Sequence, residues 1–153
     1  MNRLLAPALY AKSVVLIRLS VGLIFFTQGI LKYLDPRTGV LRFARIGFPH
    51  PAFTAHFVGT FEIACGLLVL IGLLTRPACI VLLLVILTAI STTKIPELVN
   101  PAQGFWFMVS DARTDFAMTM ALLFLLSAGA GGWSLDAWIT RRPCPSLMPR
   151  ERG

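Results

Sequence analysis

Long apolar runs recur along this chain, and polar residues gather mostly between them. A helix needs about 20 consecutive apolar residues to cross the hydrocarbon core of a bilayer. Four segments approach that length, at residues 13–33, 55–74, 77–93 and 114–130. The pattern therefore predicts an all-α fold, an integral membrane four-helix bundle in which each run crosses the bilayer once. The fourth run is short and begins beside Asp115, so a buried or interfacial helix is its alternative.

The connections between the runs differ in length. Residues 75–77 leave only a tight turn between the second and third runs, and Pro77 suits a helix start, which predicts an antiparallel hairpin. The connection between the first and second runs is longer. Within it Val40 and Phe43 share one helical face, whereas Arg42 points elsewhere. This arrangement predicts a short helix lying in the membrane interface.

The composition agrees with a membrane protein. Apolar residues make up 56% of the chain and charged residues only 14%, with a mean hydropathy of +0.77. A soluble domain carries about 25% charged residues, so this chain has too little polar surface for a small soluble domain. The net charge of +7 does not indicate nucleic-acid binding, because the cations lie between and beyond the apolar runs rather than in one basic patch.

The distribution of Lys and Arg predicts the orientation of the bundle. More of these residues lie on the side that would hold both termini and the turn at residues 75–77. Because cytoplasmic loops are enriched in Lys and Arg, both termini are expected in the cytoplasm. Residues 1–153 then form a single transmembrane domain, and residues 131–153 form a basic cytoplasmic tail.

The chain carries no recognisable thiol or metal motif. Its three cysteines, Cys65, Cys79 and Cys144, form no CxxC pair, and buried thiols usually behave as small apolar groups. A thiol oxidoreductase is therefore the least favoured reading. His50 and His56 lack a third ligand at metal-binding spacing, so no metal site is expected.

Charged residues within apolar runs are costly in lipid and usually mark functional or paired sites. In the first run, Arg18 and Lys32 lie on one helical stripe with Gly22 and Gly29 between them. Glycines allow a neighbouring helix to approach closely, so this stripe predicts a packing face with a cation near each end. Lys32 is also near enough to the interface to extend its amine to the headgroups, and this alternative stays open.

Glu62 is the acidic residue within the second run. Gly59 and Gly66 lie on its own helical face, so a polar group again lies between small residues. Glu62 is too deep to reach the interface easily, and we expect it to face a cavity or an ion-pair partner. The sequence leaves open whether that partner is Lys32 or Arg18.

Polar side chains from all four runs gather at one end of the predicted bundle. Because the first two helices are antiparallel, Gln28 lies at nearly the depth of Glu62. The third run adds hydroxyl residues and the fourth adds Asp115, whereas the other half of these helices is nearly all apolar. The expected ligand-binding residues are Gln28, Lys32, Glu62 and Asp115.

Four sequence pieces occur together in order: RLSVGLIFFTQGILK from Arg18, GFPHP from Gly47, FEIACGLLVLIGLLTR from Phe61 and GAGGWSLDAW from Gly129. Together they resemble the DoxX family of small bacterial membrane proteins over nearly the whole chain. By position, the resemblance implies that the motif residues are Arg18, Gly22, Gly29, Lys32, Glu62, Gly66 and Gly72. Many relatives have Glu where this chain has Asp115.

The resemblance implies a four-helix bundle in the bacterial cytoplasmic membrane, and some relatives are subunits of quinone-linked oxidoreductases. Our first hypothesis is therefore a membrane subunit of a redox complex, with a polar site in the non-cytoplasmic half of the bundle. The chain has no complete redox centre, so we expect no intrinsic cofactor, a bound quinone, and a soluble or membrane redox partner. A homo-oligomer is compatible with this reading. The alternative is a non-enzymatic scaffold, or a protein that binds a lipid or small solute.

Overall fold

The computed structural model describes residues 6–95 and 104–140, which are helical apart from short turns and loops. The long helices are α1 (Ala6–Leu34), α3 (Pro51–Ile71), α4 (Thr75–Ala89) and α6 (Gly104–Ala128). A π-helical turn, η1 (Ile90–Lys94), continues α4, and the short helices are α2 (Val40–Ile46) and α7 (Leu135–Thr140). The prediction of an all-α bundle with a short helix after the first run is confirmed.

The bounds of α3 differ from those of the second apolar run. The helix begins at Pro51 rather than at residue 55, because proline suits the first turn, where its missing N–H costs no hydrogen bond. It ends at Ile71 rather than at residue 74, because Gly72 adopts a left-handed φ of 72°. The Leu73 N–H then donates to the Leu68 carbonyl oxygen at 3.0 Å, which satisfies a free carbonyl at the helix end.

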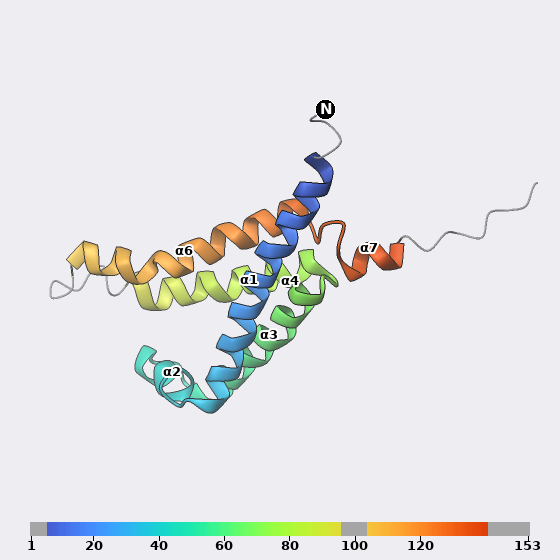
Figure 1. The fold of residues 1–153 in the computed structure, drawn as a ribbon. Coiled ribbons are helices and arrows are strands. Elements are labelled where there is room, and N and C mark those ends of the chain that lie inside the picture. The colour runs from blue at the N-terminus through green and yellow to red at the C-terminus, as the bar shows by residue number, and fades with distance from the viewer. Residues whose placement is uncertain (1–5, 96–103, 141–153) are drawn as a thin grey trace, which may run out of the picture.

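The long helices form two pairs that cross each other at a steep angle. In Figure 1, α1 and α3 run side by side, and α4 and α6 form the second pair. The tight turn at the end of α3 links the pairs. The short helix α2 packs against α3 near the end of α1, so it lies at one end of the first pair.

Glycines form the seam between α1 and α3. A Cβ atom at Gly29 would lie 2.7 Å from the Gly59 carbonyl oxygen, and one at Gly66 would lie 2.8 Å from the Phe26 nitrogen. A Cβ atom at Gly22 would lie 2.9 Å from the Gly66 carbonyl oxygen. These obstacles are backbone atoms of the facing helix, so the two helices approach closely only because side chains are absent here.

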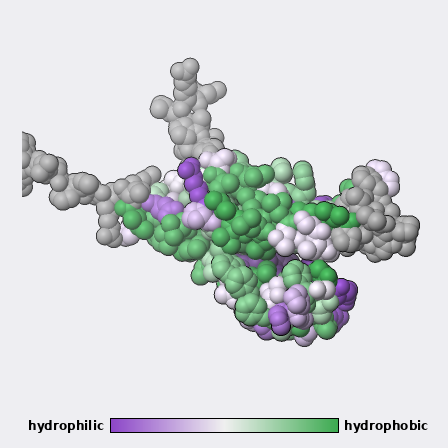
Figure 2. Space-filling model, turned by 180° about the vertical axis from the view of Figure 1, so that it is seen from behind, coloured by the Kyte–Doolittle hydropathy of each residue, from purple (hydrophilic) through white to green (hydrophobic). Residues whose placement is uncertain are grey.

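Buried apolar side chains from all four long helices form one core. Its largest fully buried members are Leu82, Leu122, Leu125, Val14, Val21 and Val69. Many other large apolar side chains face outward, and Figure 2 shows apolar residues covering much of the middle of one face. An apolar exterior is costly in water but suits lipid, which agrees with a membrane protein.

Three helical stretches are long and apolar enough to cross a membrane: Ser13–Leu34, Pro51–Ile71 and Thr75–Lys94. α6 packs beside them as the fourth helix but is not among these stretches, and its first half carries Asp111, Arg113 and Asp115. Its crossing of the bilayer stays a prediction. α7 was not predicted; it lies within the expected tail at residues 131–153, of which residues 141–153 lie outside the described residues.

Candidate functional site

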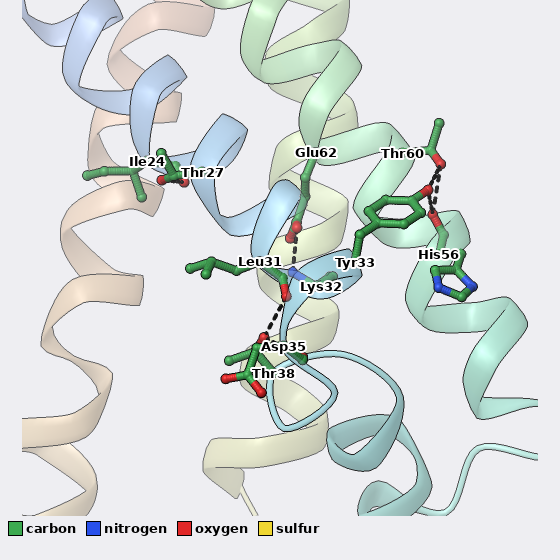
Figure 3. Close-up of polar contacts among 10 residues, drawn as sticks. All are labelled: Ile24, Thr27, Leu31, Lys32, Tyr33, Asp35, Thr38, His56, Thr60 and Glu62. Carbon is green, nitrogen blue, oxygen red and sulfur yellow. Dashed lines mark hydrogen bonds and ion pairs between the residues drawn. The ribbon is translucent and has the colours of Figure 1, made fainter.

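Lys32 and Glu62 form an ion pair between α1 and α3. Their side chains are only 10% and 6% exposed, and Figure 3 shows the Lys32 amine and the Glu62 carboxylate pointing at each other. The glycine seam makes this possible, since a Cβ atom at Gly59 would lie 3.3 Å from the Lys32 Cβ. The Lys32 amine therefore remains within the bundle rather than extending to the headgroups.

The ion pair lies at a cavity of about 320 Å³. Its walls come from α1, α2, α3, α4 with η1, and α6, so the cavity lies where the two helix pairs meet. All four ligand-binding residues expected from the sequence line it: Gln28, Lys32, Glu62 and Asp115. Most of the remaining wall is apolar, with hydroxyl groups on one side: Ile24, Phe25, Phe43, Ile46, Phe48, Val58, Leu84, Val85, Ile86, Ala89, Met118, Thr88, Thr92, Thr93 and Thr114.

Arg42 also lines the cavity, contrary to the sequence prediction that it points away from the packed face. The apolar pattern of α2 suggested a face through Val40 and Phe43. In the structure Arg42 and Ile46, one helical turn apart, reach the cavity together with Phe43. The Arg42 Nη2 donates to Thr93 Oγ1 at 3.4 Å. The rotation of α2 is set by its packing on α3, which a seven-residue pattern cannot specify.

Gln28 and Asp115 enter the cavity from α1 and α6. Gln28 is more exposed than the Lys32–Glu62 pair, and Asp115 is half-buried. The Asp115 carbonyl oxygen accepts a hydrogen bond from Thr119 Oγ1 at 2.7 Å, as part of α6. Among the described residues, no hydrogen bond or ion pair engages the side chain of either residue, so both can contact a ligand.

Arg18 lies away from this cavity and is not the partner of Glu62. Its Nη1 and Nη2 donate to the carbonyl oxygens of Ala130 and Trp133, at 2.7 and 2.9 Å. Its guanidinium thereby holds the segment that follows α6, and it packs against Gly72, where a Cβ atom would collide with it. Arg18 is thus a structural residue that ties the C-terminal segment to the bundle.

A second ion pair was missed by sequence reasoning. Lys94, at the end of η1, pairs with Asp111 of α6, and its side chain is 9% exposed. Lys94 follows the third apolar run and reads from sequence as an ordinary interfacial cation. The pair joins α4 to α6 near the hydroxyl-bearing wall of the cavity, one helical turn before Asp115. Lys94 lies within the π-helical turn η1. Such turns are frequent at functional sites, but the sequence does not reveal them, so it offered no signal for this pair.

Tyr33 joins α1 to α3 outside the cavity. Its hydroxyl lies 3.0 Å from the His56 carbonyl oxygen and 2.6 Å from Thr60 Oγ1, and its ring stacks on the His56 ring at 4.9 Å (Figure 3). Because Tyr33 directly follows Lys32, these contacts hold the last turn of α1 against α3. The neighbouring Thr38 Oγ1 donates to the Leu31 carbonyl oxygen at 3.0 Å and closes the same helix end.

The sequence pattern of the DoxX family matches residues 13–95, more than half of the chain. The chain belongs to the DoxX family. The match spans α1 to η1 and includes Lys32, Glu62 and Arg42, whereas Asp115 lies beyond it.

Two relatives align with most of the chain. The "Uncharacterized membrane protein Rv3486" of Mycobacterium tuberculosis is 47% identical over 136 residues, covering 85% of this DoxX protein and 83% of the relative. The "Putative oxidoreductase CatD" of Bacillus subtilis is 28% identical over 124 residues, covering 81% and 84%. No solved structure matches the chain. This DoxX protein is a multi-pass membrane protein.

Proposed function

We propose that this DoxX protein is the membrane subunit of a quinone-linked redox complex and binds a quinone headgroup in the cavity beside Lys32 and Glu62. The observation that carries the proposal is the cavity itself. It is mostly apolar, yet it holds one buried ion pair, the side chains of Gln28, Arg42 and Asp115, and four threonine hydroxyls. Ligand sites commonly combine apolar walls with a few convergent polar groups in this way.

The residues present fit such a ligand. Small-molecule sites commonly enclose roughly 300–1,000 Å³, and this cavity of about 320 Å³ suits a ring-sized headgroup. Phe25, Phe43 and Phe48 provide apolar surface for a ring. Lys32 and Arg42 can donate hydrogen bonds to its oxygens, and Gln28 can donate or accept.

The carboxylates suit proton transfer. A bound quinone would accept two electrons and two protons from its surroundings. Of the carboxylates that line the cavity, Glu62 can pass protons to the ligand one at a time. Lys32 keeps Glu62 in place and neutralises its charge in the apolar interior. The electrons would come from a reduced donor protein, which makes the chain a subunit of a larger complex. The relative named as an oxidoreductase supports this assignment.

The proposal is tested by identifying the ligand that copurifies with the protein. The protein is purified in a mild detergent, extracted with organic solvent, and analysed for quinone by ultraviolet absorption and mass spectrometry. We expect quinone in near-stoichiometric amount in the wild type. The double variant Lys32→Met, Glu62→Gln removes both charges and should lose it, while Ser20→Leu on the outer face of α1 should retain it.

Two results would contradict the proposal. Equal quinone in the wild type and the double variant would indicate that quinone partitions into the detergent micelle rather than the cavity. A phospholipid or small solute recovered from the wild type in place of quinone, and lost from the double variant, would favour the non-enzymatic binding protein instead. Circular dichroism and gel filtration confirm that the double variant remains folded.

A further inference from the structure

Two opposite charges that line the cavity, Arg42 and Asp115, form no ion pair with another described residue. Arg42 makes one long hydrogen bond, from Nη2 to Thr93 Oγ1 at 3.4 Å, which leaves most of its donors unused. Asp115 lines the same cavity, and its carboxylate pairs neither with Arg42 nor with another described residue. By contrast, the charges of Lys32 and Glu62 are satisfied by each other. Arg42 and Asp115 are therefore the charged groups of the cavity that keep hydrogen-bonding capacity for a headgroup.

Hydrogen-bond chemistry makes these two groups selective. An arginine only donates, and an ionised aspartate only accepts. A quinone oxygen is a carbonyl and only accepts, so it can bind Arg42 but is repelled by the Asp115 carboxylate. A quinol oxygen is a hydroxyl, which accepts from Arg42 or donates to Asp115. The reduced headgroup alone can satisfy both residues at once.

We propose that the cavity distinguishes the redox state of its ligand and binds the quinol form more tightly than the quinone form, with Asp115 as the residue that determines the preference. The proposal rests on the proposed function. Hydrogen bonds to charged groups are about twice as strong as neutral ones. When the Asp115 carboxylate faces a quinone carbonyl oxygen, both are acceptors, so neither gains a hydrogen bond. We therefore expect a preference of about tenfold or more.

The preference has a consequence for electron transfer. Ligand binding and reduction are linked, so tighter binding of the reduced form raises the midpoint potential of the bound quinone. A tenfold preference corresponds to about 30 mV for a two-electron couple. The cavity would thus make its quinone a stronger oxidant toward the donor protein than the same quinone in the bilayer.

The test compares the affinities of both redox forms under anaerobic conditions. The protein in lipid nanodiscs is titrated with a short-chain ubiquinone and, separately, with its quinol, and free ligand is measured after equilibrium dialysis. Protein-free nanodiscs correct for partition into lipid. The same titrations are made with Asp115→Asn, whose amide can also donate to a carbonyl oxygen. Asp35→Asn serves as the matched control, because Asp35 lies outside the cavity and its side chain is 40% exposed.

We expect the wild type and Asp35→Asn to favour the quinol, and Asp115→Asn to bind both forms with affinities within about twofold. Equal affinities in the wild type would overturn the selectivity, and an unchanged preference in Asp115→Asn would overturn the role of Asp115; both results leave quinone binding intact. Saturable binding of neither form would overturn the proposed function as well. The two failures are therefore distinguishable.

Discussion

Lys32 of α1 and Glu62 of α3 are each other's partners within the bundle. The two residues are 30 positions apart in sequence, yet the glycine seam brings their helices together at one depth. This pair answers the question that the sequence left open, because Arg18 bonds to backbone carbonyl oxygens instead.

Loss of both partners should destabilise the protein by less than the sum of the two single losses. Lys32→Met leaves the Glu62 carboxylate alone in an apolar interior, and Glu62→Gln leaves the Lys32 amine alone. Removing one partner of a buried pair costs on the order of 3 kcal/mol. We expect the double variant to lose clearly less than the sum, as read from thermal unfolding in detergent and analysed as a double-mutant cycle. Simple additivity would show that the two charges do not depend on each other.

Replacing a glycine of the seam with a larger residue should disrupt the packing of α1 on α3. At Gly29 the obstacles are the Gly59 carbonyl oxygen and the Ile63 backbone nitrogen, at 2.7 and 2.9 Å from a Cβ atom. Gly29→Leu therefore forces the helices apart and should cost about 1–3 kcal/mol or more. Ser20→Leu adds a side chain on the exposed face of α1 and should leave the melting temperature nearly unchanged. If Gly29→Leu melted at the same temperature as the wild type, the glycines of α1 would face lipid rather than α3.

Arg18 should matter for stability rather than for ligand binding. Arg18→Met leaves the Ala130 and Trp133 carbonyl oxygens without their donor and should cost on the order of 3 kcal/mol. Arg37→Met removes an exposed arginine at the end of α1 and should change stability little. Thermal unfolding measures the loss of stability in Arg18→Met, and quinone content after purification shows whether this variant still binds the ligand. A folded Arg18→Met protein without quinone would contradict the separation of the two regions.

The two arginines of α2 offer a matched comparison. Arg42 lines the cavity, whereas Arg45 is exposed on the same helix. Arg42→Gln should weaken binding of quinone and quinol alike by about tenfold, because an arginine serves an oxygen that accepts in either redox state. Arg45→Gln should bind as the wild type does. Similar losses from both variants would indicate a general effect of positive charge on α2 rather than a contact in the cavity.

The orientation in the membrane can be tested independently of any ligand. Reporter fusions after residues 75 and 142 should report the cytoplasm, and fusions after residues 49 and 101 the opposite side. Because α6 is not among the three stretches that are long and apolar enough to cross a membrane, the fusion after residue 142 is the decisive one. If it reports the same side as residue 101, then α6 does not cross the bilayer, and the four-span topology fails.

The sequence by itself determined the helices, the glycine seam and the approximate depth of the polar residues. In lipid every backbone polar group must be satisfied within the segment, so long apolar runs become helices. Each residue then advances a fixed distance along the helix axis. Position along a run therefore becomes depth in the bundle, and this is why Gln28 and Glu62 were expected at nearly the same depth and are found, with Lys32, at one cavity.

Only the tertiary structure decided the pairings and the cavity. Depth does not specify how each helix is rotated, and rotation depends on contacts between residues far apart in sequence. The steep crossing of the two helix pairs, the rotation of α2 that brings in Arg42, and the pairing of Lys94 with Asp111 all arise in this way. The docking of Arg18 on the segment after α6 has the same origin, since its partners lie more than a hundred residues away. Short-range periodicity contains no information on contacts of that range.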